Sequence, residues 1–582
     1  MKKLSFKGIK KNIKQGIHGI RYDLESAPWL KMHEKNNVPT TLVYPECTMY
    51  DLLEKAAIEY PTHLAFEYFN KDCTYKDFID RIKRCAKALL NIGVTSDSTV
   101  TLLMPNTPEG IICFYACNMI GAVANMVHPL SSETEIEYCV NKAGSKFLLT
   151  LDALYDKLYE IKDNVKLKKI FLVSVAESMP AVTTVLFKLT KGRKIKITKP
   201  VTDNVIMWKD FLYEGRDTEL IKSNKKDTDL AVILYSGGTT GSPKGVMHSS
   251  RTFNVTAIQH HAVCPDAREG KSILCILPIF HGFGLGICFH TTLTTGMKCY
   301  IIPKFTPAEF GKLIKTYKPN FIAGVPTLYE ALMQTDMKGQ TLSYLTTCLS
   351  GGDTLTPDLH NKINAFLDKH GSKANLKIGW GMTETVASAT ATPTSDTIPG
   401  SIGIPNPDNA CKIVKPGTTE NVFYDEDGEL CVTGPTVMMG YIDDEEETNI
   451  ALKKHDDGKV WLHTGDMASM TKEGMIFFKS RIKRMIISSG YNIYPNHIEG
   501  VLNSHPKVLT SIVVGAPHPY KGEIAKAYVV LKPEYKETEE IDQELKEYCA
   551  KNLAKYSLPS SIEYRETLPV TKIGKADYRN VK

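Results

Sequence analysis

The sequence predicts an α/β protein with two domains of unequal size. The large N-terminal domain is expected to contain mainly parallel sheets flanked by helices, together with a β-subdomain, and a small α+β domain is expected to follow. Short apolar runs alternate with helical patterns from Ser98 onward, which is typical of parallel sheets. The pattern changes after Lys479, where a basic stretch precedes short strand-like runs. A chain of 582 residues with 42% hydrophobic and 23% charged residues can fill several globular cores.

The large domain is expected to span residues 46–480. Helical patterns follow its strands at 109–126 and 327–333. The expected strands lie at 100–104, 147–151, 170–175, 231–235, 272–277, 321–324, 345–350 and 376–379. Because ligands of such sheets usually bind beyond the carboxyl ends of the strands, we expect the functional residues at those ends.

The last hundred residues predict a separate small domain at 485–582, joined through a hinge at 481–484. Strands are expected at 485–488, 512–514 and 527–531, a turn at 490–495, and an amphipathic helix at 541–555. The basic residues of 481–484 and the turn that follows them are typical of a domain joint.

Two segments are strongly basic. Seven lysine and arginine residues precede Asp23 within the expected N-terminal arm, residues 1–45, and its isoleucines share one helical face. The segment 185–199 mixes apolar and basic residues in the same way. One interpretation is that 1–22 and 185–199 make peripheral contact with an anionic membrane surface. The other is that the first is a solvated arm and the second a solvated loop.

Several classes of protein are disfavoured. Charges of both signs are interspersed and no nucleic-acid-reading motif is present, so we expect no nucleic-acid partner. The 14 cysteines have no paired spacing, which predicts reduced core residues and a cytoplasmic protein, bound at most to the inner face of the membrane. The longest apolar stretch, 111–127, contains two asparagines and is too short for a confident transmembrane helix. The oligomeric state is not predicted, and both a monomer and a homodimer are possible interpretations.

The most informative segment is 235–245, YSGGTTGSPKG, which follows an expected buried strand. Its glycines let backbone N–H groups approach phosphate oxygens, its hydroxyls add donors, and Lys244 adds a positive charge. The expected phosphate-binding residues are Ser236, Gly237, Gly238, Thr239, Thr240, Gly241 and Lys244. The segment is not a Walker A loop, because Gly245 follows the lysine.

A second cluster of polar residues, 379–385 (GWGMTET), follows the last expected strand of the large domain. Trp380 is suited to stacking on adenine, Thr383 to bonding an α-phosphate, and Glu384 to holding Mg²⁺ against the leaving phosphates. Alone, Glu384 would be an ordinary exposed acid. Beside a phosphate loop it predicts a nucleotide site.

These segments resemble the signatures of the adenylate-forming superfamily, and the resemblance covers nearly the whole chain. Further signatures occur in the family's order: 277–281 (LPIFH), 350–355 (SGGDTL), 463–466 (HTGD), Arg481 followed by Gly490 and Pro495, and 569–575 (PVTKIGK). The amino-acid sequence of the first half of the chain is most similar to bacterial long-chain fatty acid–CoA ligases.

The resemblance implies roles for further residues. Asp466 would accept hydrogen bonds from the ribose hydroxyls, Arg481 would contact ribose or phosphate, and Lys575 would neutralise charge as the carboxylate attacks the α-phosphate. In relatives the small domain rotates between two half-reactions, with the hinge at the position of Arg484. The remaining residues expected at the nucleotide are Gly352, Asp353, Gly381 and Met382.

The implied reaction is activation of a carboxylic acid by ATP and Mg²⁺, followed by transfer of the acyl group to coenzyme A. The residues expected at the acyl group are Phe280, His281, Gly351 and Gly381. An amino acid is disfavoured because His281 replaces the acid that would hold its ammonium, and a medium- or long-chain fatty acid is favoured. The alternatives are loading of a carrier protein, another hydrophobic acid such as an aryl or bile acid, and an inactive lipid-binding relative.

Overall fold

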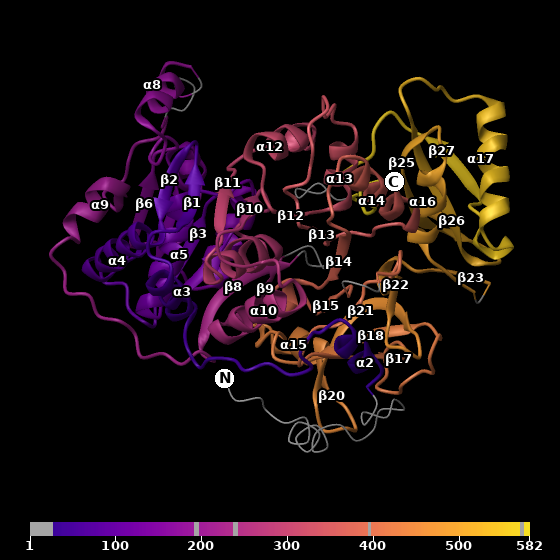
Figure 1. The fold of residues 1–582 in the computed structure, drawn as a ribbon, viewed down its shortest axis with the longest axis horizontal. Coiled ribbons are helices and arrows are strands. Elements are labelled where there is room, and N and C mark those ends of the chain that lie inside the picture. The colour runs from indigo at the N-terminus through magenta and orange to yellow at the C-terminus, as the bar shows by residue number, and fades with distance from the viewer. Residues whose placement is uncertain are drawn as a thin grey trace.

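The computed structural model describes residues 27–190, 192, 197–236, 243–393, 397–489, 491–570 and 576–581. The chain forms an α/β large domain with two extensive sheets, a β-subdomain and a small C-terminal domain (Figure 1). One continuous cluster of buried apolar side chains joins the two sheets through the helices between them. The predicted fold class is confirmed.

The first sheet has the strand order β19-β9-β8-β4-β3-β5-β6-β7, and its central strands are parallel. Its strands are β3 (Thr99–Leu103), β4 (Val123–Met126), β5 (Phe147–Leu151), β6 (Lys169–Val173), β7 (Val205–Met207), β8 (Leu230–Ser236), β9 (Lys244–Ser249) and β19 (Gly440–Tyr441). The strand β9 returns antiparallel to β8, so this edge of the sheet is a hairpin.

The second sheet has the order β16-β15-β14-β13-β12-β10-β11-β1-β2 and is parallel from β14 to β1. Its strands are β1 (Leu64–Tyr68), β2 (Lys71–Thr74), β10 (Ser272–Cys275), β11 (Lys298–Ile301), β12 (Phe321–Gly324), β13 (Thr347–Ser350), β14 (Leu376–Trp380), β15 (Thr390–Ala391) and β16 (Ile404–Pro405). The carboxyl ends of β13 and β14 carry the glycine-rich segments that the sequence singled out.

The β-subdomain is an antiparallel sheet with the order β17-β18-β21-β20, and β22 pairs with β21. Its strands are β17 (Ala410–Val414), β18 (Gly428–Thr433), β20 (Leu452–Lys454), β21 (Val460–Met470) and β22 (Ile476–Arg481). Residues Pro28–Lys35, which fall in the expected N-terminal arm, form the helix α2. Trp29 of α2 is buried in the core of this subdomain.

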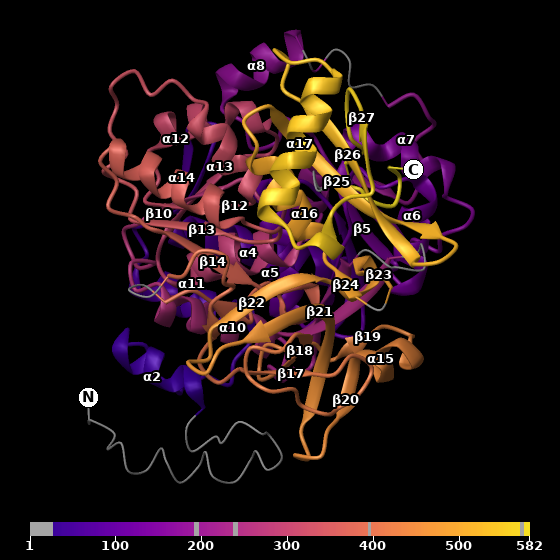
Figure 2. The same ribbon diagram turned by 90° about the vertical axis from the view of Figure 1, so that its right-hand side faces the viewer.

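The small domain is a separate body with its own core (Figure 2). Its sheet has the order β24-β23-β26-β25, with β27 beside β26. Its elements are β23 (Ile486–Ser488), β24 (Tyr491–Ile493), α16 (Pro495–Ser504), β25 (Val508–His518), β26 (Gly522–Leu531), α17 (Glu539–Asn552), η8 (Lys555–Ser557) and β27 (Ser561–Tyr564). The strands β25 and β26 form a hairpin that is much longer than the short strands expected, and the expected turn at 490–495 contains β24 and the start of α16.

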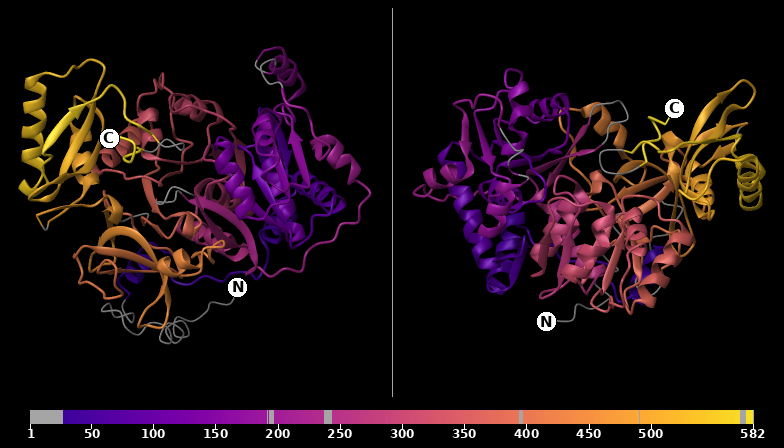
Figure 3. Two further views of the ribbon diagram at one scale, coloured as in Figure 1. Left: turned by 180° about the vertical axis from the view of Figure 1, so that it is seen from behind. Right: turned by 90° about the horizontal axis from the view of Figure 1, so that it is seen from above.

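Helices fill the space around the sheets, as the views from behind and from above show (Figure 3). Their bounds are α3 (Met49–Glu59), α4 (Tyr75–Asn91), α5 (Pro108–Ile120), α6 (Glu133–Lys142), η2 (Asp152–Leu154), α7 (Tyr155–Glu160), α8 (Ala181–Leu189), α9 (Trp208–Glu214), α10 (Ser250–Val263), η4 (Phe283–Thr291), α11 (Thr292–Thr294), η5 (Pro307–Glu309), α12 (Phe310–Tyr317), α13 (Pro326–Met333), α14 (Pro357–Lys369), η6 (Thr383–Thr385), α15 (Glu445–Ala451) and η7 (Ile482–Arg484).

The expected helix at 109–126 is wrong at its end. Gly121 adopts a left-handed conformation, with φ of 79°, that ends α5, and residues 123–126 form the strand β4 instead. Every residue of α5 is buried, which explains the long apolar run without a membrane. Among the described residues, no helix combines the length and the apolar character needed to cross a bilayer. All 14 cysteines are free thiols and all but Cys47 are buried, as expected of core residues.

Candidate active site

The phosphate-loop segment connects two strands of a hairpin. The strand β8 ends at Ser236, β9 begins at Lys244, and these two residues are register partners. The expected residues Gly237, Gly238, Thr239, Thr240 and Gly241 lie outside the described part of the chain. The hairpin therefore brings Ser236 and Lys244, the two expected phosphate-binding residues that are described, to the same edge of the first sheet.

Glu384 lies beside this edge although it follows β14 of the other sheet. Its side chain is buried, and its Oε1 atom accepts hydrogen bonds from the hydroxyl of Tyr441 at 2.8 Å and from that of Ser236 at 3.4 Å. The backbone N–H of Met438 donates to the carbonyl of Glu384 at 2.8 Å. These contacts fix the carboxylate between the two sheets.

Lys244 reaches the same place from β9. Its Nζ lies 2.5 Å from Oε2 of Glu447 in α15 and 4.9 Å from the ring centre of Tyr441. Tyr441 stands on β19, which pairs antiparallel with β9, so the ring is carried by the neighbouring strand. Neither Tyr441 nor Glu447 was expected from the sequence. The Gly-Tyr pair at 440–441 was the only local sequence feature that could have pointed to Tyr441. Glu447 had no such feature, because its ion pair with Lys244 joins residues far apart in the chain.

A second group of side chains lies on the other side of the loop after β14. The indole Nε1 of Trp380 donates to Oδ2 of Asp466 at 3.0 Å, and Nε of Arg481 lies 2.9 Å from Oδ1 of the same carboxylate. Asp466 and Arg481 are register partners on β21 and β22. Burial raises the pKa of Asp466, while the Arg481 charge and the Trp380 hydrogen bond oppose this shift. The sequence-predicted residues are thus in direct contact.

The turn before Asp466 has a support that the sequence did not reveal. Glu429 of β18 accepts from the backbone N–H of Gly465 at 3.1 Å through Oε1, and its Oε2 lies 2.9 Å from Nδ1 of His463. Nε2 of His463 lies 2.9 Å from Nε2 of His455, and burial lowers the pKa of His455 to about 4. The buried carboxylate of Glu429 therefore holds the Thr-Gly-Asp turn from behind.

Thr383 begins the short helix η6 on the same loop. Its carbonyl accepts from Nε2 of the buried His248 at 2.7 Å. Met382 precedes it and accepts from the backbone N–H of Thr385. Val386 has φ of 61°, which is a strained conformation for a β-branched residue. Such strain is typical of functional loops, and here it turns the chain immediately after Glu384.

The glycines around the expected acyl site have packing roles. A Cβ on Gly282 would lie 1.7 Å from the carbonyl oxygen of Val386, and one on Gly381 would lie 2.2 Å from that of Ala387. The α-carbon of Gly381 therefore lies close to the backbone of residues 387 and 388, and any side chain at this position would clash with it. The expected place of Gly381 at the acyl group stays a prediction.

The other residues expected at the acyl group lie at the ends of β10 and β13. The ring of Phe280 lies 4.3 Å from that of His128, and Nδ1 of His281 accepts from the backbone N–H of Phe283 at 3.3 Å. A Cβ on Gly351 would lie 2.9 Å from the carbonyl oxygen of Gly379 and 3.4 Å from the ring of Phe283. These contacts place Phe283 between the two segments.

The exposed end of the loop after β13 faces the small domain. Gly352 has φ of 81°, and the exposed Asp353 accepts from the backbone N–H of Thr354 at 2.8 Å. Asn496 of the small domain donates to the hydroxyl of Thr354 at 3.1 Å. A nucleotide bound near Gly352 would therefore lie close to the interface of the two domains.

Arg484, the expected hinge residue, is held by groups of the small domain. Its guanidinium lies 2.5 Å from Oε1 of Glu499 and 4.5 Å from the ring centre of Tyr578, and it donates to Asn496 at 2.7 Å and to the carbonyl of Val513 at 3.3 Å. Burial raises the pKa of Glu499, and the charge of Arg484 opposes this shift. Lys575 and the arm 1–22 lie outside the described residues.

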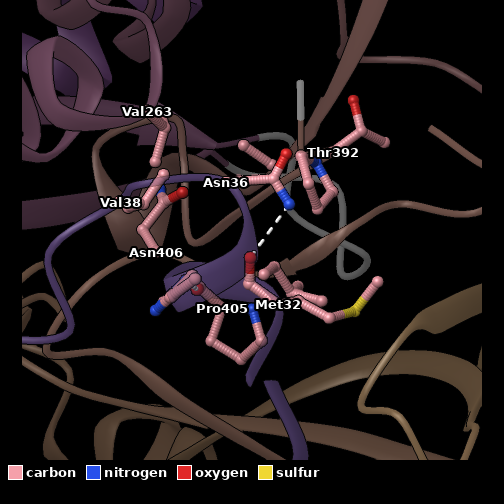
Figure 4. A pocket seen from close by; sticks show the side chains of 11 residues that line it. Met32, Asn36, Val38, Val263, Thr392, Pro405 and Asn406 are labelled. Atoms are coloured by element: carbon pink, nitrogen blue, oxygen red, sulfur yellow. Dashed lines mark hydrogen bonds between the residues drawn. The ribbon is translucent and has the colours of Figure 1, made fainter. Parts of the chain in front are cut away.

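The donor set at Glu384 fits a magnesium ion, because it combines a carboxylate with the hydroxyls of Ser236 and Tyr441, and Mg²⁺ prefers hard oxygen ligands. A small apolar pocket elsewhere, lined by α2 and the ends of β15 and β16, is unrelated to this site (Figure 4). In that pocket the side chain of Asn36 donates to the carbonyl of Met32 at 2.9 Å.

Solved structures of similar fold support the same architecture. The anthranilate CoA ligase AuaEII in complex with anthranoyl-AMP gives a TM-score of 0.79 at 22% identity and covers 93% of this chain and 96% of that one. The ATP-bound MatB from Rhodopseudomonas palustris gives a TM-score of 0.77 at 22% identity, with 91% and 97% covered. At this level of identity the likeness concerns the fold.

Sequence comparisons identify the family. A long-chain-fatty-acid–CoA ligase of Bacillus subtilis is 34% identical over 560 residues, which cover 94% of this chain and 96% of that protein. A probable 4-coumarate–CoA ligase of Dictyostelium discoideum is 29% identical, with 88% and 90% covered. The pattern described as AMP-binding enzyme matches residues 53–442, and that of the AMP-binding enzyme C-terminal domain matches 497–575. The chain therefore belongs to the AMP-binding enzyme family.

Proposed function

We propose that this protein is an AMP-forming acyl-CoA ligase that activates a medium- or long-chain fatty acid. The observation that carries the proposal is the convergence of Lys244, Glu384 and the Trp380–Asp466 pair around the loop that follows β14. A base-stacking ring, a ribose acceptor, a metal ligand and a phosphate-binding cation are the groups that one nucleotide requires. The similarity to long-chain-fatty-acid–CoA ligases supports the choice of acid.

The first half-reaction needs no protein nucleophile. The carboxylate of the acid attacks the α-phosphate of ATP, the bond between the α- and β-phosphates breaks, and pyrophosphate leaves, so the protein acts by positioning and by neutralising charge. Phosphate oxygens would replace Glu447 as the partner of Lys244. A magnesium ion held by Glu384 would supply further neutralisation of the leaving phosphates.

The nucleoside would be held by the second group of residues. The carboxylate of Asp466 can accept from both ribose hydroxyls, and its contacts with Trp380 and Arg481 keep it oriented. Glu429 would act through the turn at Gly465 as a positioning residue. In the second half-reaction the thiolate of coenzyme A attacks the acyl carbonyl and AMP leaves.

The proposal is tested with acids of graded chain length, aryl acids and a bile acid, with pyrophosphate, AMP and thioester measured separately. We expect ATP-dependent pyrophosphate release with all long-chain acids, and thioester in an amount equal to AMP when coenzyme A is present. AMP without thioester would indicate loading of a carrier protein, and turnover of aryl acids alone would contradict the fatty-acid assignment. No pyrophosphate release with any acid would refute the ligase activity.

Lys575→Ala provides a matched variant for the first half-reaction. We expect it to lose nearly all acid-dependent pyrophosphate release, by at least about 100-fold, while ATP binding measured by calorimetry stays close to that of the wild type. Lys555→Ala, which removes an exposed lysine of η8 in the same domain, serves as the control. Unchanged pyrophosphate release by Lys575→Ala would remove this lysine from the mechanism.

A further inference from the structure

Three side chains that can bind a metal ion meet inside the β-subdomain. They are Cys431 of β18, His455 at the end of β20 and His463 of β21, and β21 lies between the other two strands (Figure 1). Each side chain offers one ligand atom, and these three atoms lie within 4.8 Å of one another. The two half-reactions proposed above use neither Cys431 nor His455.

The pairing of the strands brings the three residues together. Cys431 and His463 are register partners on antiparallel strands, so their side chains leave the same face of the sheet. The backbone N–H of His455 donates to the carbonyl of Lys459 at 3.0 Å, in the turn that leads from β20 into β21. The side chains of Cys431, His455 and His463 are all buried. No spacing motif announces this group, because sheet order and not sequence distance creates it.

Glu429 orients one of the two imidazole rings toward the other. Its Oε2 lies 2.9 Å from Nδ1 of His463. A carboxylate only accepts, so Nδ1 of the neutral ring carries the proton and Nε2 presents a lone pair, 2.9 Å from Nε2 of His455. A carboxylate behind a ligating histidine is the usual support in metal sites. Two facing ring nitrogens share at most one hydrogen bond, whereas a metal ion would use both lone pairs.

The spacing of the group is close to that of a zinc site. Zinc binds imidazole nitrogen at about 2.0–2.1 Å and thiolate sulfur at about 2.3 Å, so ligand atoms of a tetrahedral site lie roughly 3.3–3.6 Å apart. The two Nε2 atoms are slightly closer than this at 2.9 Å, and the limit of 4.8 Å is slightly wider. Side-chain shifts of roughly one ångström would therefore form the site.

The charges around the group balance a divalent cation. A Cys431 thiolate and the buried Glu429 carboxylate would together supply two negative charges. Lys412 is buried nearby, but its Nζ lies 3.5 Å from Oδ2 of Asp457, whose side chain is also buried, so this pair is neutral. A further cation, the half-buried Lys453, reaches solvent, which screens its charge. A bound divalent ion would thus leave little uncompensated charge in the subdomain.

We propose that Cys431, His455 and His463 bind a thiophilic divalent metal ion, Zn²⁺ by the chemistry of its ligands. One thiolate and two imidazoles are ligands that zinc takes, whereas Mg²⁺ prefers oxygen, so this site is distinct from the one at Glu384. Burial raises the pKa of the Cys431 thiol, so the new metal–sulfur bond displaces its proton into solvent, and no oxidation state changes.

The site lies directly behind the turn that carries Asp466. Glu429 contacts His463 through one carboxylate oxygen and the backbone N–H of Gly465 through the other. A metal ion on His463 would therefore stiffen the turn next to the proposed ribose ligand. That consequence rests on the proposed function, but metal binding itself does not, and it is tested without turnover.

The first test is titration of the full-length protein, free of any histidine tag, with Co²⁺ under reducing conditions after chelator treatment and dialysis. We expect one equivalent to bind, with a charge-transfer band from sulfur to cobalt that disappears on addition of Zn²⁺. Cys431→Ser should lack the band. The matched control Cys411→Ser, which changes a buried thiol of the adjacent strand β17, should keep it. No saturable band in the wild type, or the same band in Cys431→Ser, would overturn the proposal.

A second measurement tests the histidines and the orienting carboxylate. Zinc affinity is measured by competition with a chromophoric chelator, and circular dichroism verifies that each variant is folded. We expect Glu429→Gln to weaken zinc binding by about 10- to 100-fold, and His455→Gln by at least as much. X-ray absorption of the zinc complex should show one sulfur and two imidazole ligands. Unchanged affinity in folded His455→Gln would show that the two rings only form a hydrogen bond with each other.

Discussion

Tyr441 contacts both charged residues of the proposed phosphate-binding site, Glu384 and Lys244. Its hydroxyl donates to Glu384, and its ring lies beneath the ammonium of Lys244. Burial raises the pKa of this phenol, and the neighbouring Glu384 carboxylate raises it further, so the hydroxyl stays protonated and donates at neutral pH. One side chain therefore orients the proposed metal ligand and the proposed phosphate-binding cation together.

Removal of the Glu384 carboxylate should change the dependence on magnesium. We expect Glu384→Gln to raise the Mg²⁺ concentration for half-maximal pyrophosphate release by about tenfold, because an amide binds Mg²⁺ more weakly than a carboxylate. The variant Glu447→Gln, which removes the other acid beside Lys244, is the control and should keep the wild-type dependence. A Glu384→Gln enzyme with an unaltered magnesium titration would contradict the assigned role.

Asp466 offers a test in which the substrate is changed as well as the protein. We expect Asp466→Asn to raise the KM for ATP by roughly 10- to 100-fold, since a hydrogen bond to a charged group contributes about 1.5–3 kcal/mol. With 2′-deoxy-ATP the same substitution should cost much less, because one of the two hydroxyls is already absent. Equal losses with both nucleotides would mean that Asp466 does not contact the ribose.

At the scale of elements, the strands of the parallel sheets were largely predictable from sequence. Runs such as 147–151 and 321–324 coincide with β5 and β12, because a strand buried on both faces is apolar throughout. The strand β4 was missed, since its four buried residues continue the apolar pattern of α5 and only Gly121 separates them. The hairpin of β25 and β26 was underestimated because its exposed ends alternate with polar residues.

The candidate site was predictable only where a short motif contained the residue. Trp380, Glu384 and Asp466 stand within such motifs, and the structure brings them together. Glu447 and Glu429 escaped because each acts through a pairing with a residue far away in the chain, at Lys244 and at Gly465 in a neighbouring strand. A single sequence shows which residue types are present, but it does not show which strands and helices become neighbours and so bring two distant residues together.

The ion pair of Arg484 and Glu499 should stabilise the small domain. Arg484→Ala would leave the buried carboxylate of Glu499 without its charged partner, and we expect a loss of about 3 kcal/mol in the unfolding of this domain. The double variant Arg484→Met/Glu499→Met removes both charges and should lose less. Calorimetry and chemical denaturation measure the loss, and equal losses in the two variants would show that the unpaired carboxylate of Glu499 is not its cause.

At the scale of the whole molecule, buried histidines should make the fold sensitive to acid. Burial lowers the pKa of His248 to about 4 and those of His260 and His290 to about 3. Between the unfolded value of about 6.5 and these values the unfolded chain binds protons that the folded chain does not. Stability should therefore be highest above pH 6.5 and should fall as the pH decreases toward 4, by about 3 kcal/mol for each histidine.

His260 isolates one part of this acid sensitivity. Neither of its ring nitrogens has a hydrogen-bond partner among the described residues, and its ring lies 5.7 Å from that of Phe321. We expect His260→Leu to reduce the slope of stability against pH by about one proton between pH 6.5 and 4. Chemical denaturation at a series of pH values measures this slope, and an unaltered slope would show that His260 is already protonated in the folded protein.

Within the part of the chain that the structure describes, polar side chains link the two domains. Tyr494 donates to Asp427 at 2.8 Å, and Asn496 donates to Thr354 at 3.1 Å. Contacts of this kind at exposed positions contribute little, so a change of orientation of the small domain would cost little free energy. This supports the rotation that the resemblance implies.

The contacts of Arg484 also limit where the backbone could turn during a rotation of the small domain. Because the guanidinium of Arg484 is bound to side chains of the small domain, a rotation of that domain would have to occur at the residues before it, 481–483. Arg481 is at the same time clamped to Asp466. If the small domain rotates as the resemblance implies, the segment that turns would directly follow Arg481, which contacts the proposed ribose ligand Asp466. Release of AMP and reorientation of the small domain would then be coupled through this one residue.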